Sequence, residues 1–306
     1  MRERIDLMKY IHPWLKASRL TAQGFIIPPL LLGHAIAIYL GYQVTLETVI
    51  LIHTYGLFMH LFIVYINDYA DYETDQLNQT YTPFTGGSRV LVEGMLSKVS
   101  LKKAARFMAL LTIINGIILS IASGTLFITL LILLGIFLMI AYSLQPIAIS
   151  YRGYGETLQV IGVAIILPLV AFLSHGGTMG AVLWAPILAL LPAQFAMAVS
   201  TSLPDEPSDK TSGKHTTVVN LGGQKARVLM ILLFLLSYFV SVVIIQNNGA
   251  ALWPVLLAAF PFALLVSIAL KYNAIPGSRL LSGVVLLAIL TNTTLVLSVS
   301  VIYMTT

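Results

Sequence analysis

The chain has 306 residues, of which 17 are Lys or Arg and 12 are Asp or Glu, and 58% of it is hydrophobic. A soluble domain usually carries about 25% charged residues, and so small a polar supply cannot cover a water-facing surface. Disordered chains are polar and highly charged, and the continuous apolar runs differ from the alternating strands of a membrane barrel. The composition therefore predicts an all-α integral membrane protein with a single domain over residues 1–306.

Cysteine is absent, and the formal net charge is +5. The first fact excludes disulfides, zinc–thiolate sites and cysteine nucleophiles. The second does not indicate nucleic acid as a partner, because no basic domain is present to bind it. The partner that the sequence predicts is the lipid bilayer, in which basic residues set the orientation of the protein.

Nine apolar stretches approach the ~20 residues that cross a bilayer. They cover residues 20–41, 46–66, 104–121, 124–143, 157–174, 181–202, 228–246, 250–271 and 280–303. Little more than Ser123 and Gly124 separates the third from the fourth, which predicts a tight helical hairpin. Pro168, Pro186 and Pro192 fall inside stretches and predict kinks, which membrane helices tolerate.

All 17 basic residues lie before the first stretch, in every second connection after it, or at the end of a stretch that borders such a connection. This split predicts a multi-pass protein of the cell inner membrane whose N-terminus is cytoplasmic and whose C-terminus is outside. The acidic residues lie on the same side, with Glu47 as the exception. Two connections on that side, roughly 67–103 and 203–227, are long, and long loops are often functional. We therefore expect an active site on the cytoplasmic side.

The first long connection opens with Asn67, Asp68, Asp71 and Asp75. If the preceding helix continues, Asn67, Asp71 and Asp75 share one face at i, i+4 and i+8. Adjacent carboxylates repel unless a cation neutralises them, and an oxygen-only ligand set indicates a hard ion such as Mg²⁺. A solvated helix end is the alternative.

The second long connection contains Asp205 and Asp209, which lie 134 positions after Asp71 and Asp75. This offset suggests two related four-helix units followed by a ninth helix, and Pro207 predicts a junction between loop and helix. Two such clusters facing each other would hold Mg²⁺ ions that bridge a diphosphate. The predicted metal ligands are Asn67, Asp71, Asp75, Asp205 and Asp209, and Asp68 and Tyr142 join them as candidate catalytic residues.

Basic and aromatic side chains near these motifs are candidates for substrate binding. Cations would neutralise the remaining oxygens of a diphosphate or bind an acidic acceptor, and the candidates are Arg19, Arg89, Lys98 and Lys214. Tyr142 and Tyr272 are either part of an interfacial aromatic belt or stabilise a carbocation. Four histidines fit no metal pattern, and we expect most of them to be satisfied locally: His34, His53, His60 and His175.

At these residues the chain resembles the UbiA superfamily of intramembrane prenyltransferases. Asn67, Asp68, Asp71 and Asp75 are similar to its N-D-x-x-D-x-x-x-D motif. A second motif, D-x-x-x-D-x-x-x-G-K-x-T, is matched by Asp205, Asp209, Gly213, Lys214 and Thr216. The residues entering the first helix, Trp14 to Arg19, are also similar, as is the loop after the fourth helix, with Tyr142, Pro146, Tyr151, Gly153, Gly155 and Glu156.

The resemblance implies nine transmembrane helices around a central cavity with a polar cap. It also implies Mg²⁺-dependent transfer of an isoprenyl group from a prenyl diphosphate to an acceptor that is usually aromatic, with Tyr151 among the substrate-binding residues. The Gly86-Gly87-Ser88-Arg89 and Gly213-Lys214 segments look most like the 1,4-dihydroxy-2-naphthoate, or menaquinone, branch. Leu20, where the family usually has Pro, and Pro207 depart from the pattern.

The interpretation from these residues is that the allylic C–O bond ionises inside an apolar cavity and that an electron-rich ring attacks the cation. A 4-hydroxybenzoate-type prenyltransferase and a terpene cyclase of the same superfamily remain alternatives. A secondary transporter is a more distant one, since transporters place ionisable residues near the bilayer midplane, whereas here the carboxylates lie near predicted helix ends or in loops.

Overall fold

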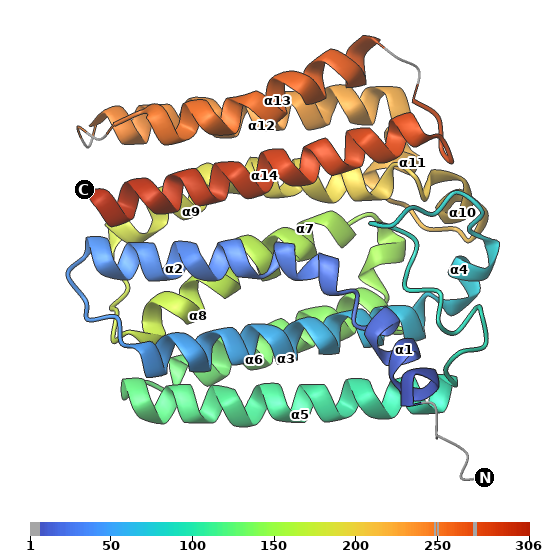
Figure 1. Cartoon of the computed structure of the whole chain (residues 1–306), viewed down its shortest axis with the longest axis horizontal. Helices are drawn as coiled ribbons and strands as arrows, with labels where there is room; N and C mark the ends of the chain where they lie inside the picture. The colour runs from blue at the N-terminus through green and yellow to red at the C-terminus, as the bar shows by residue number, and fades with distance from the viewer. Residues whose placement is uncertain (1–6, 248, 250, 272–273) are drawn as a thin grey trace.

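The computed structural model describes residues 7–247, 249, 251–271 and 274–306. Within these residues the secondary structure is helical, apart from an isolated bridge between Thr82 and Thr85 (Figure 1). Seven described helices are long and apolar enough to cross a membrane. They are α3 (Leu46–Ala70), α5 (Lys98–Ser123), the run Gly155–Ser174, α9 (Ala181–Ser202), α12 (Gly223–Asn247), α13 (Trp253–Lys271) and α14 (Arg279–Thr305). The predicted all-helical membrane class is confirmed.

Two shorter apolar helices lie where the first and fourth stretches were predicted. They are α2 (Ile27–Tyr39), with 13 residues, and α6 (Phe127–Ser143), with 17. A 3₁₀ helix over Leu20–Phe25 replaces the predicted start of the first stretch. Pro28 and Pro29 explain why α2 begins there, because proline is favoured in a first helical turn. The nine predicted stretches thus correspond to seven helices of membrane-spanning length and two shorter ones.

Local capping fixes several helix ends. The hydroxyls of Thr45, Ser97 and Ser278 accept the backbone N–H three residues later at the starts of α3, α5 and α14, which satisfies one otherwise unpaired donor each. Gly124 follows α5 in the left-handed conformation with φ of 73°, a common helix end for glycine. The predicted hairpin between α5 and α6 forms at this glycine.

Prolines interrupt two of the spans. In Gly155–Ser174 the short helices α7 (Gly155–Val160) and α8 (Leu167–Ser174) flank a π-helical turn over Ile161–Ile166, directly before Pro168. In α9, after Pro192, the Ala193 N–H and the Ala189 carbonyl both bond the Ser237 hydroxyl of α12, at 2.8 and 2.7 Å. The backbone groups that no longer bond each other within α9 are therefore satisfied by the neighbouring helix α12, as a membrane interior requires.

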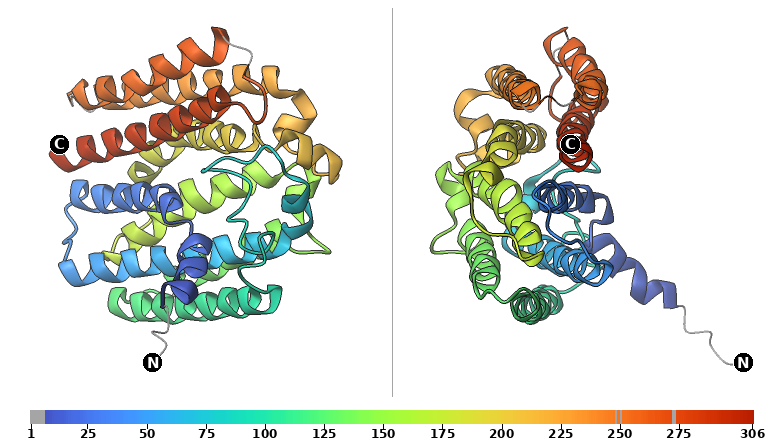
Figure 2. Two further views of the ribbon diagram at one scale, coloured as in Figure 1. Left: turned by 45° about the vertical axis from the view of Figure 1, so that its right-hand side comes forward. Right: turned by 90° about the vertical axis from the view of Figure 1, so that its left-hand side faces the viewer.

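The long helices surround a common axis rather than forming flat layers (Figure 2). Helix α3 packs on α5, α9 packs on α12, and α14 packs on both α2 and α13. The most apolar windows of Gly155–Ser174 and α9 are 61% buried, whereas those of α5, α12 and α13 are 33% buried. The first two therefore form the interior, and the outer three present apolar side chains to lipid.

The two ends of the bundle differ. The short helices α1 (Leu7–Ala17), α4 (Tyr72–Leu77), α10 (Glu206–Thr211) and α11 (Thr217–Leu221) lie at one end, and the C-terminus lies at the other (Figure 1). Away from the short helices, His34 Nδ1 lies 2.8 Å from His175 Nε2, and His34 Nε2 lies 3.3 Å from His53 Nε2. These histidines bond one another, a pairing that their spacing in the sequence gave no reason to expect.

Candidate active site

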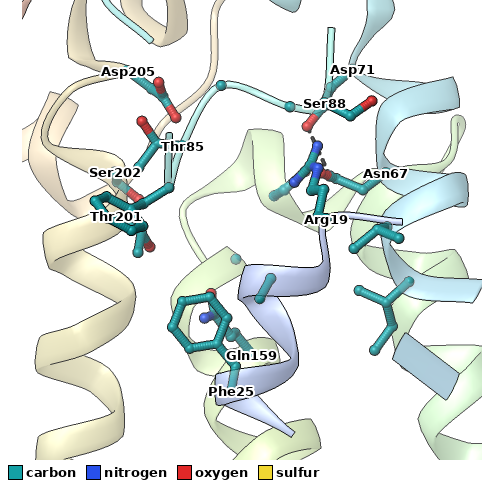
Figure 3. A pocket seen from close by; sticks show the side chains of 18 of the residues that line it. Arg19, Phe25, Asn67, Asp71, Thr85, Ser88, Gln159, Thr201, Ser202 and Asp205 are labelled. Atoms are coloured by element: carbon teal, nitrogen blue, oxygen red, sulfur yellow. Dashed lines mark hydrogen bonds between the residues drawn. The ribbon is translucent and has the colours of Figure 1, made fainter. Parts of the chain in front are cut away.

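A cavity of about 910 Å³ lies between the helices and reaches the end where the short helices gather. Aspartates, amides and cations line one part of it, and Figure 3 shows Asp71 and Asp205 on opposite sides of the pocket. Phe25 and Gln159 lie away from these carboxylates. The remaining wall is largely apolar and includes Met59, Ile63, Val64, Leu138, Met139, Ile166, Leu167, Leu286 and Ile289.

The first aspartate motif, residues 67–75, bridges two helices. Helix α3 ends at Ala70, Asp71 has φ of −87° and ψ of 8°, and α4 begins at Tyr72. The condition of one continuous helix through the motif is therefore not met. The turn is shallow, because the Asp71 N–H still bonds the Asn67 carbonyl at 2.8 Å and the Asp75 N–H bonds the Asp71 carbonyl at 2.7 Å. Asn67, Asp71 and Asp75 all line the cavity.

The second aspartate motif, residues 205–209, begins a short helix. Asp205 precedes α10, and Pro207 lies in its first turn, so the predicted junction between loop and helix is confirmed. The chain then turns at Gly213, with φ of 76°, and the Lys214 N–H bonds the Asp209 carbonyl at 2.8 Å. Asp205, Asp209 and Lys214 line the same cavity as the first motif.

Each motif is bound by a side chain that comes from the other connection. Lys214 Nζ donates to Asp71 Oδ2 at 2.9 Å and lies 4.0 Å from Asp209 Oδ1. Asn78 Nδ2 donates to Asp205 Oδ1 at 2.7 Å. Asn78 was missed in the sequence, although its position directly behind an acidic run was a usable signal. The two connections thus form one polar unit around the mouth of the cavity.

Asp68 is buried and does not line the cavity. Its carboxylate accepts hydrogen bonds from the Arg19 guanidinium, the Ser88 hydroxyl and the Ser88 N–H, the last at 3.2 Å. Gly87 has φ of 74°, and a Cβ there would collide with Asp75 Oδ2. The Gly86–Ser88 backbone therefore passes directly against the carboxylates, and Asp68, which lies in α3, anchors it to that helix.

The remaining predicted cations differ in position. Arg89 lines the cavity, but its guanidinium donates to the carbonyls of Asp75 and Asn78 at 2.9 and 3.2 Å and lies 4.2 Å from the centre of the Tyr81 ring. Lys98 is exposed at the start of α5, with its ammonium 4.1 Å from the Tyr72 ring centre, and it does not line the cavity. The structure therefore separates Lys98 from the site.

The two predicted tyrosines lie beside Lys214 and Asp71. Tyr142 lines the cavity. The Tyr151 hydroxyl bonds Thr74 Oγ1 at 2.9 Å and donates to Asp71 Oδ1 at 3.5 Å, and Lys214 Nζ lies 5.1 Å from its ring centre. Tyr151 does not itself line the cavity, so it supports the motif from behind. Tyr272 lies outside the described residues.

Crowded carboxylates raise one another's affinity for protons. Burial, and then the charge of Asp71, raise the pKa of Asp75 to about 7. Burial, opposed by Lys214 and reinforced by Asp205, raises the pKa of Asp209 to about 7. Burial raises the pKa of Asp205 to about 6, although the Asn78 hydrogen bond opposes the rise. Burial disfavours the charge of Lys214, but Asp71, Asp209 and the neighbouring tyrosines together outweigh it, and the pKa of Lys214 rises well above its ordinary value.

The donor set fits a hard divalent cation that also binds substrate. In the described part of the chain, no three Asp, Glu or His side chains converge closely enough to hold an ion by themselves. Mg²⁺ is usually held by one or two carboxylates together with substrate phosphates rather than by an all-protein cage. Raised carboxylate pKa values show that negative charge here lacks sufficient compensation, which a cation would supply.

Comparison with known proteins agrees with this geometry. The sequence profile of the UbiA prenyltransferase family matches residues 26–279. No protein of curated function matches the sequence. The fold is similar to that of a UbiA homologue from Archaeoglobus fulgidus bound to GPP and Mg²⁺, with a TM-score of 0.65 and 16% identity over 94% of this chain and 99% of that one.

Two further solved structures share the fold. An apo UbiA homologue from Aeropyrum pernix K1 has a TM-score of 0.67 and 14% identity over 89% of this chain and 97% of that one. A digeranylgeranylglyceryl phosphate synthase has a TM-score of 0.62 and 16% identity over 97% of this chain and 99% of that one. At these identities the likeness concerns the fold alone.

Proposed function

Because this chain belongs to the UbiA prenyltransferase family, we propose that it transfers an isoprenyl group from a prenyl diphosphate to an aromatic acceptor in a Mg²⁺-dependent reaction. One observation carries the proposal. Asp71 and Asp75 from one connection, and Asp205, Asp209 and Lys214 from another, line a single cavity whose remaining wall is apolar. A diphosphate requires the polar part, and an isoprenyl chain requires the apolar part.

We assign the metal-binding role to Asn67, Asp71, Asp75, Asp205 and Asp209. Mg²⁺ bound there would neutralise charge on the diphosphate as the allylic C–O bond breaks. Lys214 lies between the motifs, where it can orient the diphosphate and stabilise its developing negative charge. The apolar walls contributed by α3, α6 and α14 exclude water from the allylic cation, and Tyr142 presents an aromatic ring in the same cavity.

We propose 1,4-dihydroxy-2-naphthoate as the acceptor, in menaquinone biosynthesis. The support is the resemblance of Gly86–Arg89 and Gly213-Lys214 to that branch. Their positions fit a role in the polar cap, because Gly87 permits the close backbone approach to Asp75 and Gly213 turns the chain before Lys214. The digeranylgeranylglyceryl phosphate synthase with the same fold makes a glyceryl phosphate the informative competing acceptor.

We further propose that α2 and α6 cross the membrane with the seven longer helices, which gives nine crossings and places the short helices on the cytoplasmic side. The basic residues support this orientation. The chain has no cysteine, so Lys210→Cys and Glu47→Cys each create one labelling site. An impermeant maleimide should label Lys210→Cys only from the cytoplasmic side and Glu47→Cys only from outside, and the reverse pattern would contradict the orientation.

The activity test uses purified protein with geranyl, farnesyl or geranylgeranyl diphosphate. The acceptors are 1,4-dihydroxy-2-naphthoate, 4-hydroxybenzoate and a glyceryl phosphate, and products are identified by mass spectrometry with Mg²⁺ or with EDTA. We expect Mg²⁺-dependent prenylation of the naphthoate. Diphosphate release with a cyclic hydrocarbon and no acceptor requirement would favour a terpene cyclase, and no diphosphate release with any substrate would contradict the proposed function.

A further inference from the structure

Glu156 is a buried carboxylate in the cavity wall that neither aspartate motif includes. It is 5% exposed and lines the cavity at the start of α7. Its Oε1 accepts the backbone N–H of Thr217 at 2.7 Å. In the part of the chain that the structure describes, no Lys, Arg or His side chain forms an ion pair with it. Buried carboxylates without a charged partner are rare and costly, which points to a chemical role.

Close backbone packing holds Glu156 in place. The His215 N–H bonds the Tyr151 carbonyl at 3.3 Å, which ties the turn before α7 to the segment after Lys214. Gly153, with φ of 90°, lies against that segment, since a Cβ there would come within 3.2 Å of the His215 carbonyl oxygen. A Cβ on Gly155 would lie 3.2 Å from Tyr142 Cε2. Close packing therefore fixes the backbone around Glu156, and the Thr217 N–H holds its carboxylate.

Glu156 lies where the polar and apolar parts of the cavity meet. Its carboxylate bonds the N–H of Thr217, three residues after Lys214, and it lines the same cavity as Asp209, so it is close to the second aspartate motif. Gln159, about one helical turn further along the same wall, lines the pocket away from Asp71 and Asp205 (Figure 3). A prenyl diphosphate bound across both parts would place its first carbon near this junction, where an acceptor must approach it.

We propose that Glu156 is a catalytic base that accepts the proton of the acceptor's ring hydroxyl. The inference rests on the proposed function and extends it to a class of acceptor, an aromatic ring with a hydroxyl that activates the attacking carbon. The Thr217 N–H holds one carboxylate oxygen and orients the group. This arrangement leaves the carboxylate without a neutralising cation, which suits it to take a proton.

In the proposed step the hydroxyl proton moves to Glu156, and the electron pair of the O–H bond becomes a carbonyl π bond. The ring π bond beside the new carbonyl opens, and its electron pair joins the ring carbon to the first carbon of the prenyl group, while the C–O bond to the diphosphate breaks with its electron pair on the diphosphate. Loss of H⁺ or CO₂ from the alkylated carbon then restores the aromatic ring, and the oxygen regains a proton.

Glu156→Gln separates this role from a structural one, because the amide oxygen still accepts the Thr217 N–H but cannot take a proton. With geranyl diphosphate, Mg²⁺ and 1,4-dihydroxy-2-naphthoate, we expect the transfer rate to fall by about 10²- to 10³-fold, the usual contribution of a general base. Binding of geranyl diphosphate with Mg²⁺ should change by less than about twofold. Glu156→Asp retains a carboxylate and should lose less activity. Glu47→Gln makes the same chemical change away from the cavity and should leave both measurements unchanged.

A series of phenolic acceptors of increasing acidity gives a second measurement. The ratio of wild-type to Glu156→Gln rates should grow as the hydroxyl becomes less acidic, because a base matters most there. A ratio that stays constant across the series, or an equal loss of geranyl diphosphate binding, would overturn the proposal. Transfer by the wild-type protein reports on the proposed function, and the ratio of the two rates reports on Glu156 alone.

Discussion

The two aspartate motifs look like copies in the sequence, but the negative charge of each is compensated differently in the structure. Both follow a long helix that packs on the next long helix, α3 on α5 and α9 on α12. In the first motif Asp71 is paired with Lys214 at 2.9 Å, and Asp68 is paired with Arg19. In the second, Asp205 accepts a hydrogen bond from the neutral amide of Asn78 and forms no ion pair with any described residue, and Asp209 Oδ1 lies 4.0 Å from Lys214 Nζ.

This difference shows how charge is distributed around the cavity mouth. The lysine of the second motif neutralises the first motif, and an amide from the first connection bonds the second motif. The second motif therefore retains uncompensated carboxylate charge, and so does Asp75 of the first motif, which agrees with the raised pKa values of Asp75, Asp205 and Asp209. A bound cation would compensate the second motif together with Asp75.

The largest expected effect compares Asp71→Ala with Asp205→Ala. Both should reduce turnover by about 10³-fold or more, since each removes a carboxylate that would hold Mg²⁺ against the diphosphate. Their effects on the free energy of unfolding without Mg²⁺ should differ. Asp71→Ala leaves Lys214 buried without its nearest partner and should cost about 3 kcal/mol. Asp205→Ala removes a carboxylate whose burial is unfavourable and should stabilise the protein at pH 8 by about 1 kcal/mol.

Turnover can be measured as diphosphate release, and stability by chemical or thermal unfolding in detergent. Normal activity in either folded variant would contradict the assignment of the motifs. Equal destabilisation by both variants would leave the activity proposal intact but contradict the unequal compensation described above.

A smaller effect is expected from the two side chains that cross between the motifs. Lys214→Met should weaken binding of a prenyl diphosphate about 30-fold, because a buried charge-assisted contact is lost, whereas Asn78→Ala should weaken it about tenfold. Lys210→Met is the matched control, since Lys210 is an exposed lysine on α10 and should have no effect. Equal dissociation constants for wild type and Lys214→Met would show that this lysine serves the fold rather than the ligand.

The sequence predicted the helical class, the positions of most helices and the aspartates that line the cavity, because apolar length and motif spacing are local properties. It did not predict the helix break at Asp71, which depends on where α4 must pack. It also placed Lys98 with the diphosphate, whereas the structure directs that side chain onto Tyr72. The Asn78–Asp205 bond and the contacts among His34, His53 and His175 join distant segments, and neither leaves a periodic signal in one sequence.

The smallest effect concerns pH and tests whether excess charge on Asp75 and the second motif is what a cation relieves. The pKa values of Asp75 and Asp209, about 7, and of Asp205, about 6, lie above the ordinary value of 3.8. The folded state therefore binds protons more tightly than the unfolded state. Without Mg²⁺, the contribution of these carboxylates to the free energy of unfolding should be largest below about pH 4, fall as pH rises through 6 and 7, and level off above about pH 8.

Saturating Mg²⁺ should reduce this fall, because the ion binds the ionised carboxylates of the folded state. For the same reason, its apparent affinity should decrease as pH is lowered from 8 to 6. Asp209→Asn should flatten the pH dependence of unfolding more than Lys210→Met, which removes an exposed charge from the same helix. A stability curve unaffected by Mg²⁺ at pH 8 would show that the carboxylates of the second motif do not bind the ion before the prenyl diphosphate arrives.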